Sequence, residues 1–156
     1  MRNVATKRLA CAIAILWALD SAAPLRAQIG VGTWVRPSET SADGGLTMTV
    51  EACCNGGRRL IYRVIGSDNV IMTVESPMDG TDVPVLVAGK PTGETMGIKR
   101  LDDRHTVAVL KMNGKTFGTS TAVLSADGKT LVVENDITSA VGGQAGGKQK
   151  ETWVRK

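Results

Sequence analysis

Thr33-Trp34-Val35-Arg36 is the stretch that decides the fold, because the identical string returns as Thr152-Trp153-Val154-Arg155 at the end of the chain. A β-sheet that closes into a barrel leaves no free edge, so its first and last strands must pair with each other. The repeat marks two segments that are matched for such pairing. It therefore predicts that the two strings lie side by side and close a barrel.

Between the two strings, apolar and polar residues alternate with a period of two, which is typical of strands that bury one face. No segment shows a helical period. The chain is therefore expected to be all-β, folded as an antiparallel up-and-down β-barrel of about eight to ten strands. The inward positions predicted from the alternation are Leu46, Met48 and Val50, then Leu60, Tyr62 and Val64, then Val70, Met72 and Val74, then Val83, Val85 and Val87, then Met96 and Ile98, then Ala108, Leu110 and Met112, and last Leu131, Val133 and Ile137.

Turn residues lie between the alternating segments. Asn113-Gly114 and Asp127-Gly128 tolerate the positive backbone angles of tight turns, so each dipeptide predicts a hairpin. Pro84 lies inside an alternating segment and predicts an edge strand or a bulge, since proline has no N–H to donate to a sheet. Further reversals are predicted at Asn55-Gly56-Gly57, at Gly66 to Asn69 and at Asp102 to Arg104, with a flexible loop at Gly142 to Gly147.

Met1 to Ala27 has the pattern of a secretory signal peptide. Basic residues precede the apolar run Leu9 to Leu19, which is too short to span a bilayer, and small residues follow it. We expect cleavage after Ala27, export to the periplasm or the medium, and a single domain from Gln28 to Lys156. The alternative is an N-terminal membrane anchor that is retained.

The basic character of the chain resides mostly in this leader. The sequence has 19 lysines and arginines and 15 aspartates and glutamates. Four of the basic residues and one acidic residue lie in the leader, which leaves 15 against 14 and a net charge of +1. A net charge this small predicts no electrostatic footprint for nucleic acid. Arg58-Arg59 and Lys148 to Lys150 are interpreted as solvated strand ends.

Gly32-Thr33-Trp34 on the first predicted strand, with Trp153 and Arg155 on the last, resembles the pattern of the calycins, the superfamily of the lipocalins and their relatives. The resemblance implies that Trp34 seals the closed end of a barrel and that Arg155 lies across its ring. Such a cation–π contact contributes about 0.5 to 2 kcal/mol. From Gly32 to Trp153 the chain is similar to small exported lipocalin-like proteins of bacteria.

Cys53-Cys54, at a predicted turn, leaves several interpretations open. An oxidising compartment favours paired thiols, but adjacent cysteines bridge each other only in a strained ring. The alternatives are two reduced cysteines in an ordinary turn, a vicinal or intermolecular disulfide, and a redox-sensitive turn. A metal site is not expected, because His105 is the only histidine and lies at no ligand spacing from the two sulfurs.

The sequence contains no catalytic signature. His105 follows Asp102-Asp103, so a carboxylate can lie near it, but no nucleophile in an elbow motif accompanies it. Asp102-Asp103, and likewise Glu134 and Asp136, are interpreted as turn and outer-face residues. We therefore expect neither an enzyme nor a cofactor.

A closed barrel of about eight strands either fills its interior with side chains or keeps room for one small ligand, and the sequence leaves both alternatives open. The leading hypothesis is a non-enzymatic protein that binds a small apolar molecule. The residues expected to hold it are Leu46, Met48, Leu60, Tyr62, Met72 and Leu110. The second hypothesis is a periplasmic interaction protein, such as a protease inhibitor, with a filled core. An avidin-like biotin site would need more tryptophans than the chain has.

Overall fold

The computed structural model describes residues 30–37, 45–138 and 146–156. The predicted leader, Met1 to Ala27, lies outside the described residues, and so does most of the predicted loop Gly142 to Gly147. Both therefore remain predictions. Among the described residues, no helix has the length and apolar character needed to cross a membrane.

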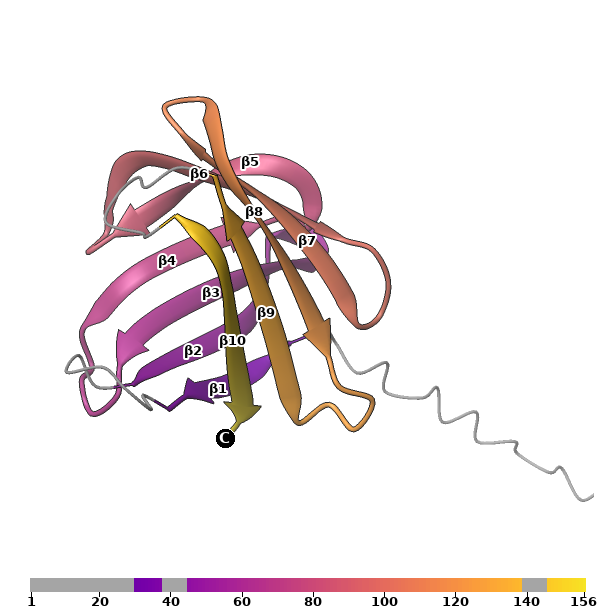
Figure 1. Ribbon diagram of the computed structural model, residues 1–156. Coiled ribbons are helices and arrows are strands. Elements are labelled where there is room, and N and C mark those ends of the chain that lie inside the picture. The colour runs from indigo at the N-terminus through magenta and orange to yellow at the C-terminus, as the bar shows by residue number, and fades with distance from the viewer. Residues whose placement is uncertain (1–29, 38–44, 139–145) are drawn as a thin grey trace, which may run out of the picture.

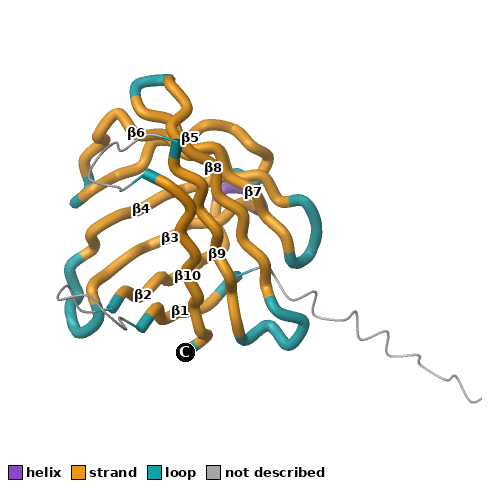
Figure 2. Tube along the Cα trace, in the orientation of Figure 1, coloured by secondary structure: helices purple, strands orange, loops and turns teal. Residues whose placement is uncertain are grey.

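The described chain consists of ten antiparallel strands and one short 3-10 turn, and the strands form a closed barrel (Figure 1). Almost all of it is strand, with loops only at the turns (Figure 2). This confirms the predicted fold class and places the strand number at the upper end of the expected range. The strands are β1 (Gly32–Arg36), β2 (Leu46–Cys53), β3 (Gly57–Val64), β4 (Val70–Ser76), β5 (Asp79–Val87), β6 (Lys90–Arg100), β7 (His105–Met112), β8 (Lys115–Leu124), β9 (Thr130–Ile137) and β10 (Gly147–Arg155), and the 3-10 turn is Cys54–Gly56.

Strands β1 and β10 close the barrel, as the repeated string predicts. They pair antiparallel, with Trp34 opposite Arg155 and Val35 opposite Val154. Every other neighbouring pair in the barrel joins strands that are consecutive along the chain. The pairing is centred on Val35 and Val154, so the tryptophan of each string lies beside the arginine of the other. The repeat therefore produces two Arg–Trp contacts across one strand pair.

The turns agree with the sequence at most positions. Asn113 and Gly114 form the tight turn between β7 and β8, with φ values of 48° and 79°. Asp127 and Gly128 lie in a longer connection between β8 and β9. Ser125 Oγ spans this connection, because it accepts a hydrogen bond from Thr130 N and donates one to Asp127 Oδ1. Pro84 predicts either an edge strand or a bulge. The closed barrel has no edge strand, and the register shift between Pro84 and Leu86 shows the bulge.

The inward positions predicted from the alternation form most of the core. Val74 and Val85 are fully buried, while Met48 and Leu110 are 4 % exposed. The prediction fails at strand ends, where Val70 and Val87 are 36 % and 44 % exposed. A strand end projects beyond the neighbouring strands, so the same alternation that buries a central residue leaves a terminal one at the rim.

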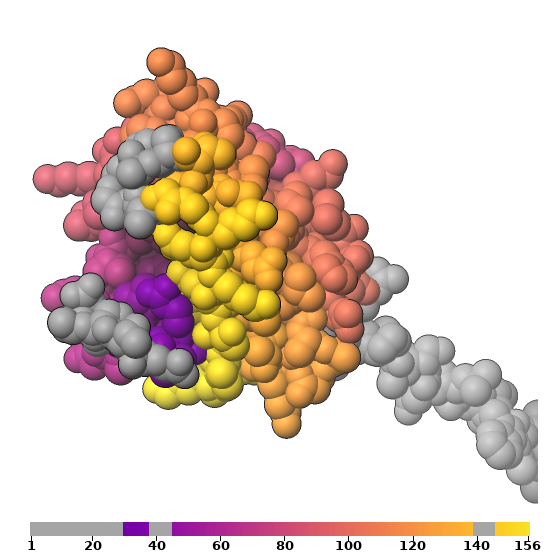
Figure 3. All heavy atoms as spheres, in the orientation of Figure 1, coloured from indigo at the N-terminus to yellow at the C-terminus, as the bar shows by residue number. Residues whose placement is uncertain are grey.

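The barrel wall is uneven around its circumference. In Figure 1, strands β1 to β4 run across the direction of β8 to β10, so the interior lies between two crossing layers. β10 pairs with β9 from Gly147 to Val154, but with β1 only at Val154 and Arg155. Among the described residues, no strand pairs with the first half of β10 on its β1 side. Figure 3 shows the surface hollowed between the yellow residues of β10 and the magenta strands.

Candidate functional site

The interior of the barrel contains a cavity of about 430 Å³. The structure therefore has a hollow barrel instead of the filled core that was the other alternative. Ten strands enclose a wider space than eight, and the domain from Gln28 onward offers only two tryptophans, one tyrosine and one phenylalanine to fill it. The six residues predicted to hold a ligand, Leu46, Met48, Leu60, Tyr62, Met72 and Leu110, all line this cavity.

The cavity wall is mainly apolar and rich in methionine. Met48, Met72 and Met96 line it, as the alternation predicts, and Met78 joins them from the β4–β5 turn. Met112 shares the predicted inward parity but does not line the cavity. It packs instead against the buried cluster of Leu110, Phe117 and Ile137, of which only Leu110 lines the cavity. Flexible thioether side chains allow such a wall to adapt to ligands of irregular shape.

Trp34 lies at one end of the barrel and is completely buried. Its Nε1 donates a hydrogen bond of 2.6 Å to the Gly30 carbonyl. The guanidinium of Arg155 lies 4.5 Å from the ring centroid. Arg155 is held in place because its Nη1 donates to the Val31 carbonyl at 2.6 Å and its Nε to the Gly128 carbonyl at 2.8 Å. The structure thus has the Trp–Arg closure that the resemblance implies.

Gly32 is required by this closure. Its φ is +132°, which lies in the region that only glycine adopts readily. A Cβ atom at this position would also lie 2.6 Å from Arg155 Nη1. The absence of a side chain at Gly32 therefore leaves room for the Arg155 guanidinium beside Trp34.

Trp153 has a different role from Trp34, because its ring lines the cavity. It meets Tyr62 edge to face with 5.9 Å between the ring centroids, and Arg36 lies 5.4 Å from its centroid. Glu151 joins this group: one carboxylate oxygen accepts a hydrogen bond of 2.5 Å from Arg36 Nη1, and the other accepts one of 3.2 Å from Trp153 Nε1. The Glu151 charge is thus already compensated. Sequence reasoning missed Arg36 and Glu151, although Glu151 shares the parity of Trp153.

Two other ionisable residues of the cavity are affected by burial. Burial raises the pKa of the Tyr62 phenol, so the phenol stays neutral at physiological pH. Burial also raises the pKa of the Glu94 carboxyl on β6. Both groups line a mainly apolar space, which disfavours their charged forms.

Arg58 corrects a sequence interpretation. The sequence interpretation of a solvated strand end is wrong for this residue, because Arg58 is only 6 % exposed and lines the cavity. Its Nη1 donates hydrogen bonds to the carbonyls of Gly56 and Gly57, at 3.1 and 2.7 Å. Arg59 points outward and forms ion pairs with Glu75 and Glu51. The signal was present in the sequence, because Arg58 has the same parity as Leu60 and Tyr62.

Cys53 and Cys54 are joined by a disulfide bond between neighbouring residues of the chain. Of the interpretations left open by the sequence, the structure therefore has the vicinal disulfide. It lies in the reversal from β2 to β3, where Cys54, Asn55 and Gly56 all have positive φ values. Within the described residues, no cluster of three His, Cys, Asp or Glu side chains could hold a metal ion.

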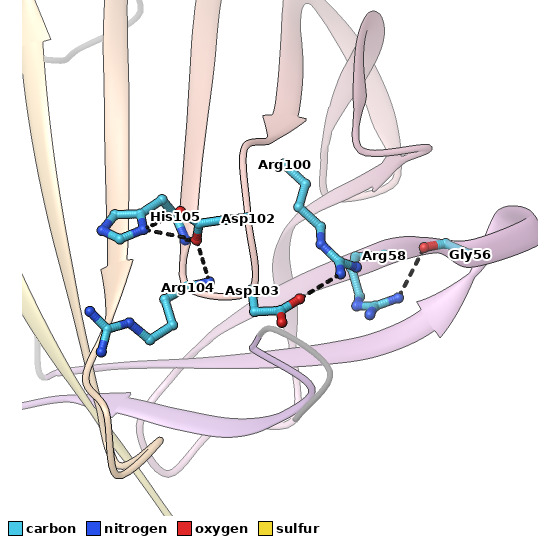
Figure 4. A network of polar contacts seen from close by, with 7 residues as sticks. All are labelled: Gly56, Arg58, Arg100, Asp102, Asp103, Arg104 and His105. Atoms are coloured by element: carbon cyan, nitrogen blue, oxygen red, sulfur yellow. Dashed lines mark hydrogen bonds and ion pairs between the residues drawn. The ribbon is translucent and has the colours of Figure 1, made fainter. Parts of the chain in front are cut away.

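His105 is the first residue of β7 and belongs to the polar cluster at the turn after β6 (Figure 4), outside the set of cavity-lining residues. Asp102 Oδ1 accepts hydrogen bonds from the backbone N–H groups of Arg104 and His105, at 2.7 and 2.8 Å. His105 Nδ1 lies 2.8 Å from both oxygens of Asp102. These contacts, the Arg104 hydrogen bond above all, lower the pKa of Asp102. With Asp103 bound to Arg100 at 3.1 Å, the cluster fixes a turn.

Glu134 and Asp136 lie on the outer face of β9, as expected. Glu134 pairs with Lys150 at 3.0 Å and Asp136 with Lys148 at 4.0 Å. The four side chains are all more than half exposed. They are surface ion pairs of adjacent strands.

Comparison with known proteins gives a match in fold. No family model matches the sequence, and no curated protein is similar to it in sequence. A crystal structure of a single-residue mutant of the fluorescent protein UnaG is similar with a TM-score of 0.57 and 15 % sequence identity, over 81 % of this chain and 96 % of that chain. At this identity the similarity shows the fold alone. The chain is thus a calycin-like β-barrel, as the sequence resemblance implies.

Proposed function

We propose that this protein is an exported, non-enzymatic calycin-like protein that binds a small, largely apolar ligand inside its barrel. The observation that carries the proposal is the cavity of about 430 Å³. Ligand sites in proteins typically enclose roughly 300 to 1,000 Å³, with apolar walls and a few polar groups that fix orientation. The interior of this barrel has both properties.

The placement of the reactive side chains supports binding without catalysis. The only histidine of the chain, His105, lies outside the cavity-lining set and is held by Asp102. Of the two carboxylates in the cavity, Glu151 is held by Arg36 and Trp153. A carboxylate held in this way is a poor general base, because two donors already stabilise its charged form.

Two observations support export. Met1 to Ala27 has the pattern of a signal peptide, and an oxidising compartment favours a disulfide such as Cys53–Cys54. N-terminal sequencing of the protein recovered from the extracytoplasmic fraction should give a first residue within a few positions of Gln28. Recovery of the intact leader in the cytoplasm would contradict export and leave the binding proposal unaffected.

Ligand binding can be tested by filling the cavity. Ala108 on β7 is 8 % exposed and lines the cavity, whereas its neighbour Val109 is 37 % exposed and faces outward. We expect the apolar fluorophore N-phenyl-1-naphthylamine to bind the wild-type protein with a dissociation constant of about 1 to 100 µM, given the ligand efficiency of small apolar molecules. The variant Ala108→Phe places a ring in the cavity and should weaken binding about tenfold or more.

Val109→Phe is the matched control, because it adds a similar ring to the outer face of the same strand. Fluorescence titration of the three proteins gives the dissociation constants. Equal affinity in Ala108→Phe and Val109→Phe, or no binding to the wild type, would overturn the proposed function. Far-UV circular dichroism of each variant shows that the barrel is intact.

A further inference from the structure

One wall of the cavity carries a row of uncharged polar side chains. Asn135 on β9 lies directly opposite Ser120 on β8 and directly opposite Gln149 on β10. All three residues line the cavity, and we call them the polar row. Beyond Ser120 the same row becomes apolar, because Ser120 lies opposite Ala108 and Ala108 opposite Ile98. The polar groups are thus collected on the β8–β10 side.

The Ser120 hydroxyl and the Asn135 carboxamide make no side-chain hydrogen bond within the described part of the chain. Both residues are only half buried, and no polar side-chain atom of the described residues is completely enclosed without a partner. The hydrogen-bonding capacity of these two groups is therefore directed at the space where a ligand would lie. Gln149 is exposed and marks the place where the row reaches the surface.

A purely apolar ligand would fit this wall poorly. It would displace water from Ser120 and Asn135 without replacing the hydrogen bonds, and a polar group left without a partner weakens binding by about tenfold. A carboxamide both donates and accepts, so a ligand must do both to satisfy the Asn135 side chain. The row itself carries no charge. In the part of the chain that the structure describes, the ionisable groups that line the cavity, apart from Tyr62, are two arginines, Arg36 and Arg58, and two glutamates, Glu94 and Glu151. Their charges balance, so they do not favour an anion over an uncharged group.

We infer that the ligand bears an uncharged group with both a donor and an acceptor, of the carboxamide or lactam type, which faces Ser120 and Asn135 while its apolar body contacts the methionine-rich wall. This inference rests on the proposed function and adds the chemical class of the ligand. The donor and the acceptor of this ligand group would form hydrogen bonds with the carboxamide of Asn135 and the hydroxyl of Ser120.

Three probes with the same apolar body separate the possibilities: naphthalene, 2-naphthamide and 2-naphthoate. Their dissociation constants can be measured by NMR titration of the purified protein. We expect 2-naphthamide to bind about tenfold tighter than naphthalene, because it replaces the hydrogen bonds that water makes to the polar row. We expect 2-naphthoate to bind no tighter than naphthalene.

Variants then locate the effect. Ser120→Ala and Asn135→Ala should each reduce the advantage of the amide to about threefold or less. Naphthalene should bind these variants somewhat tighter than the wild type, because it no longer leaves the removed group without a partner. Thr119→Ala and Asp136→Ala are the matched controls, because these neighbours face outward on the same strands. Both controls should retain the full advantage of the amide.

The outcomes distinguish this inference from the proposed function. If naphthalene binds in the cavity but the amide is no tighter, or its advantage survives in both Ser120→Ala and Asn135→Ala, the inference is overturned and the proposed function stands. Tighter binding of 2-naphthoate than of 2-naphthamide also overturns it. If none of the three probes binds, both fail. Retained naphthalene binding in a variant shows that the variant is folded. If either Ser120→Ala or Asn135→Ala does not fold, the affinity of the other variant for the amide decides the test.

Discussion

Glu94 lies on β6 with its side chain at the cavity, and within the described residues no cation forms an ion pair with it. Burial raises its pKa, so the folded protein binds a proton there more tightly than the unfolded chain does. A carboxyl of this kind favours folding as the pH falls and opposes folding as the pH rises. The ionised form of the Glu94 carboxyl therefore lowers the free energy of unfolding at neutral pH.

We expect Glu94→Gln to be more stable than the wild type at pH 7, because glutamine cannot ionise. The difference should shrink as the pH falls toward the ordinary pKa of glutamate, about 4.3, and vanish below it, where the wild-type carboxyl becomes protonated in both states. Urea unfolding between pH 4 and pH 8 measures it. Glu134→Gln, which removes only a surface ion pair worth about 1 kcal/mol at most, is the control. A Glu94→Gln variant less stable than the wild type at pH 7 would contradict this account.

Sequence alternation predicted most of the apolar residues of the cavity, although not Ile71, Met78 or Ala122, and it missed the charged ones. Leu60 and Tyr62 were expected to face inward, and Arg58 has the same parity but was interpreted as solvated. The reason is physical: burial of an arginine depends on acceptors that the fold supplies, here the carbonyls of Gly56 and Gly57. Those carbonyls are brought to Arg58 by a turn whose conformation the alternation does not encode.

The β1–β10 pair is the element on which closure depends. Its antiparallel register, centred on Val35 and Val154, places Arg155 beside Trp34 and Arg36 beside Trp153. The repeated string therefore predicted the pairing correctly. The string alone could not predict that Trp34 is completely buried at one end of the barrel while Trp153 lines the cavity. This difference depends on the stagger of β10 against β9 and β1.

We expect Arg155→Ala to lower the free energy of unfolding by about 1 to 3 kcal/mol, through loss of the cation–π contact and of two hydrogen bonds to carbonyls. Gly32→Ala should cost a similar amount, since it adds backbone strain and displaces the guanidinium. In the Arg155→Ala background, Gly32→Ala should cost about 1 kcal/mol less, because the displaced group is already absent.

Gly66→Ala is the control for that double-mutant cycle. Gly66 also has a positive φ, but a Cβ atom there would meet nothing within 4 Å. Its cost should therefore be the same with or without Arg155. Additivity of Gly32→Ala and Arg155→Ala to within about 0.5 kcal/mol, measured by chemical denaturation, would show that Gly32 does not hold a place for the arginine.

At the scale of the whole molecule, ten strands with few aromatic side chains enclose more space than they fill. The sequence predicted the fold class because period-two alternation and turn residues are local signals. It left open whether the barrel is hollow, because alternation shows which side chains face inward but not whether they meet in the middle. That depends on strand number and stagger, which only the assembled barrel fixes.

The measurement that tests the central claim most directly is NMR of the protein labelled with ¹³C at its methionine methyl groups, titrated with naphthalene. Met48, Met72, Met78 and Met96 line the cavity, whereas Met112 is not among the cavity-lining residues and serves as the internal reference. We predict saturable shifts of the four cavity methyl signals, with contacts to the naphthalene protons, while the Met112 signal stays in place. Unchanged cavity signals under conditions where naphthalene is in excess, or shifts confined to Met112, would contradict a hollow, ligand-binding barrel.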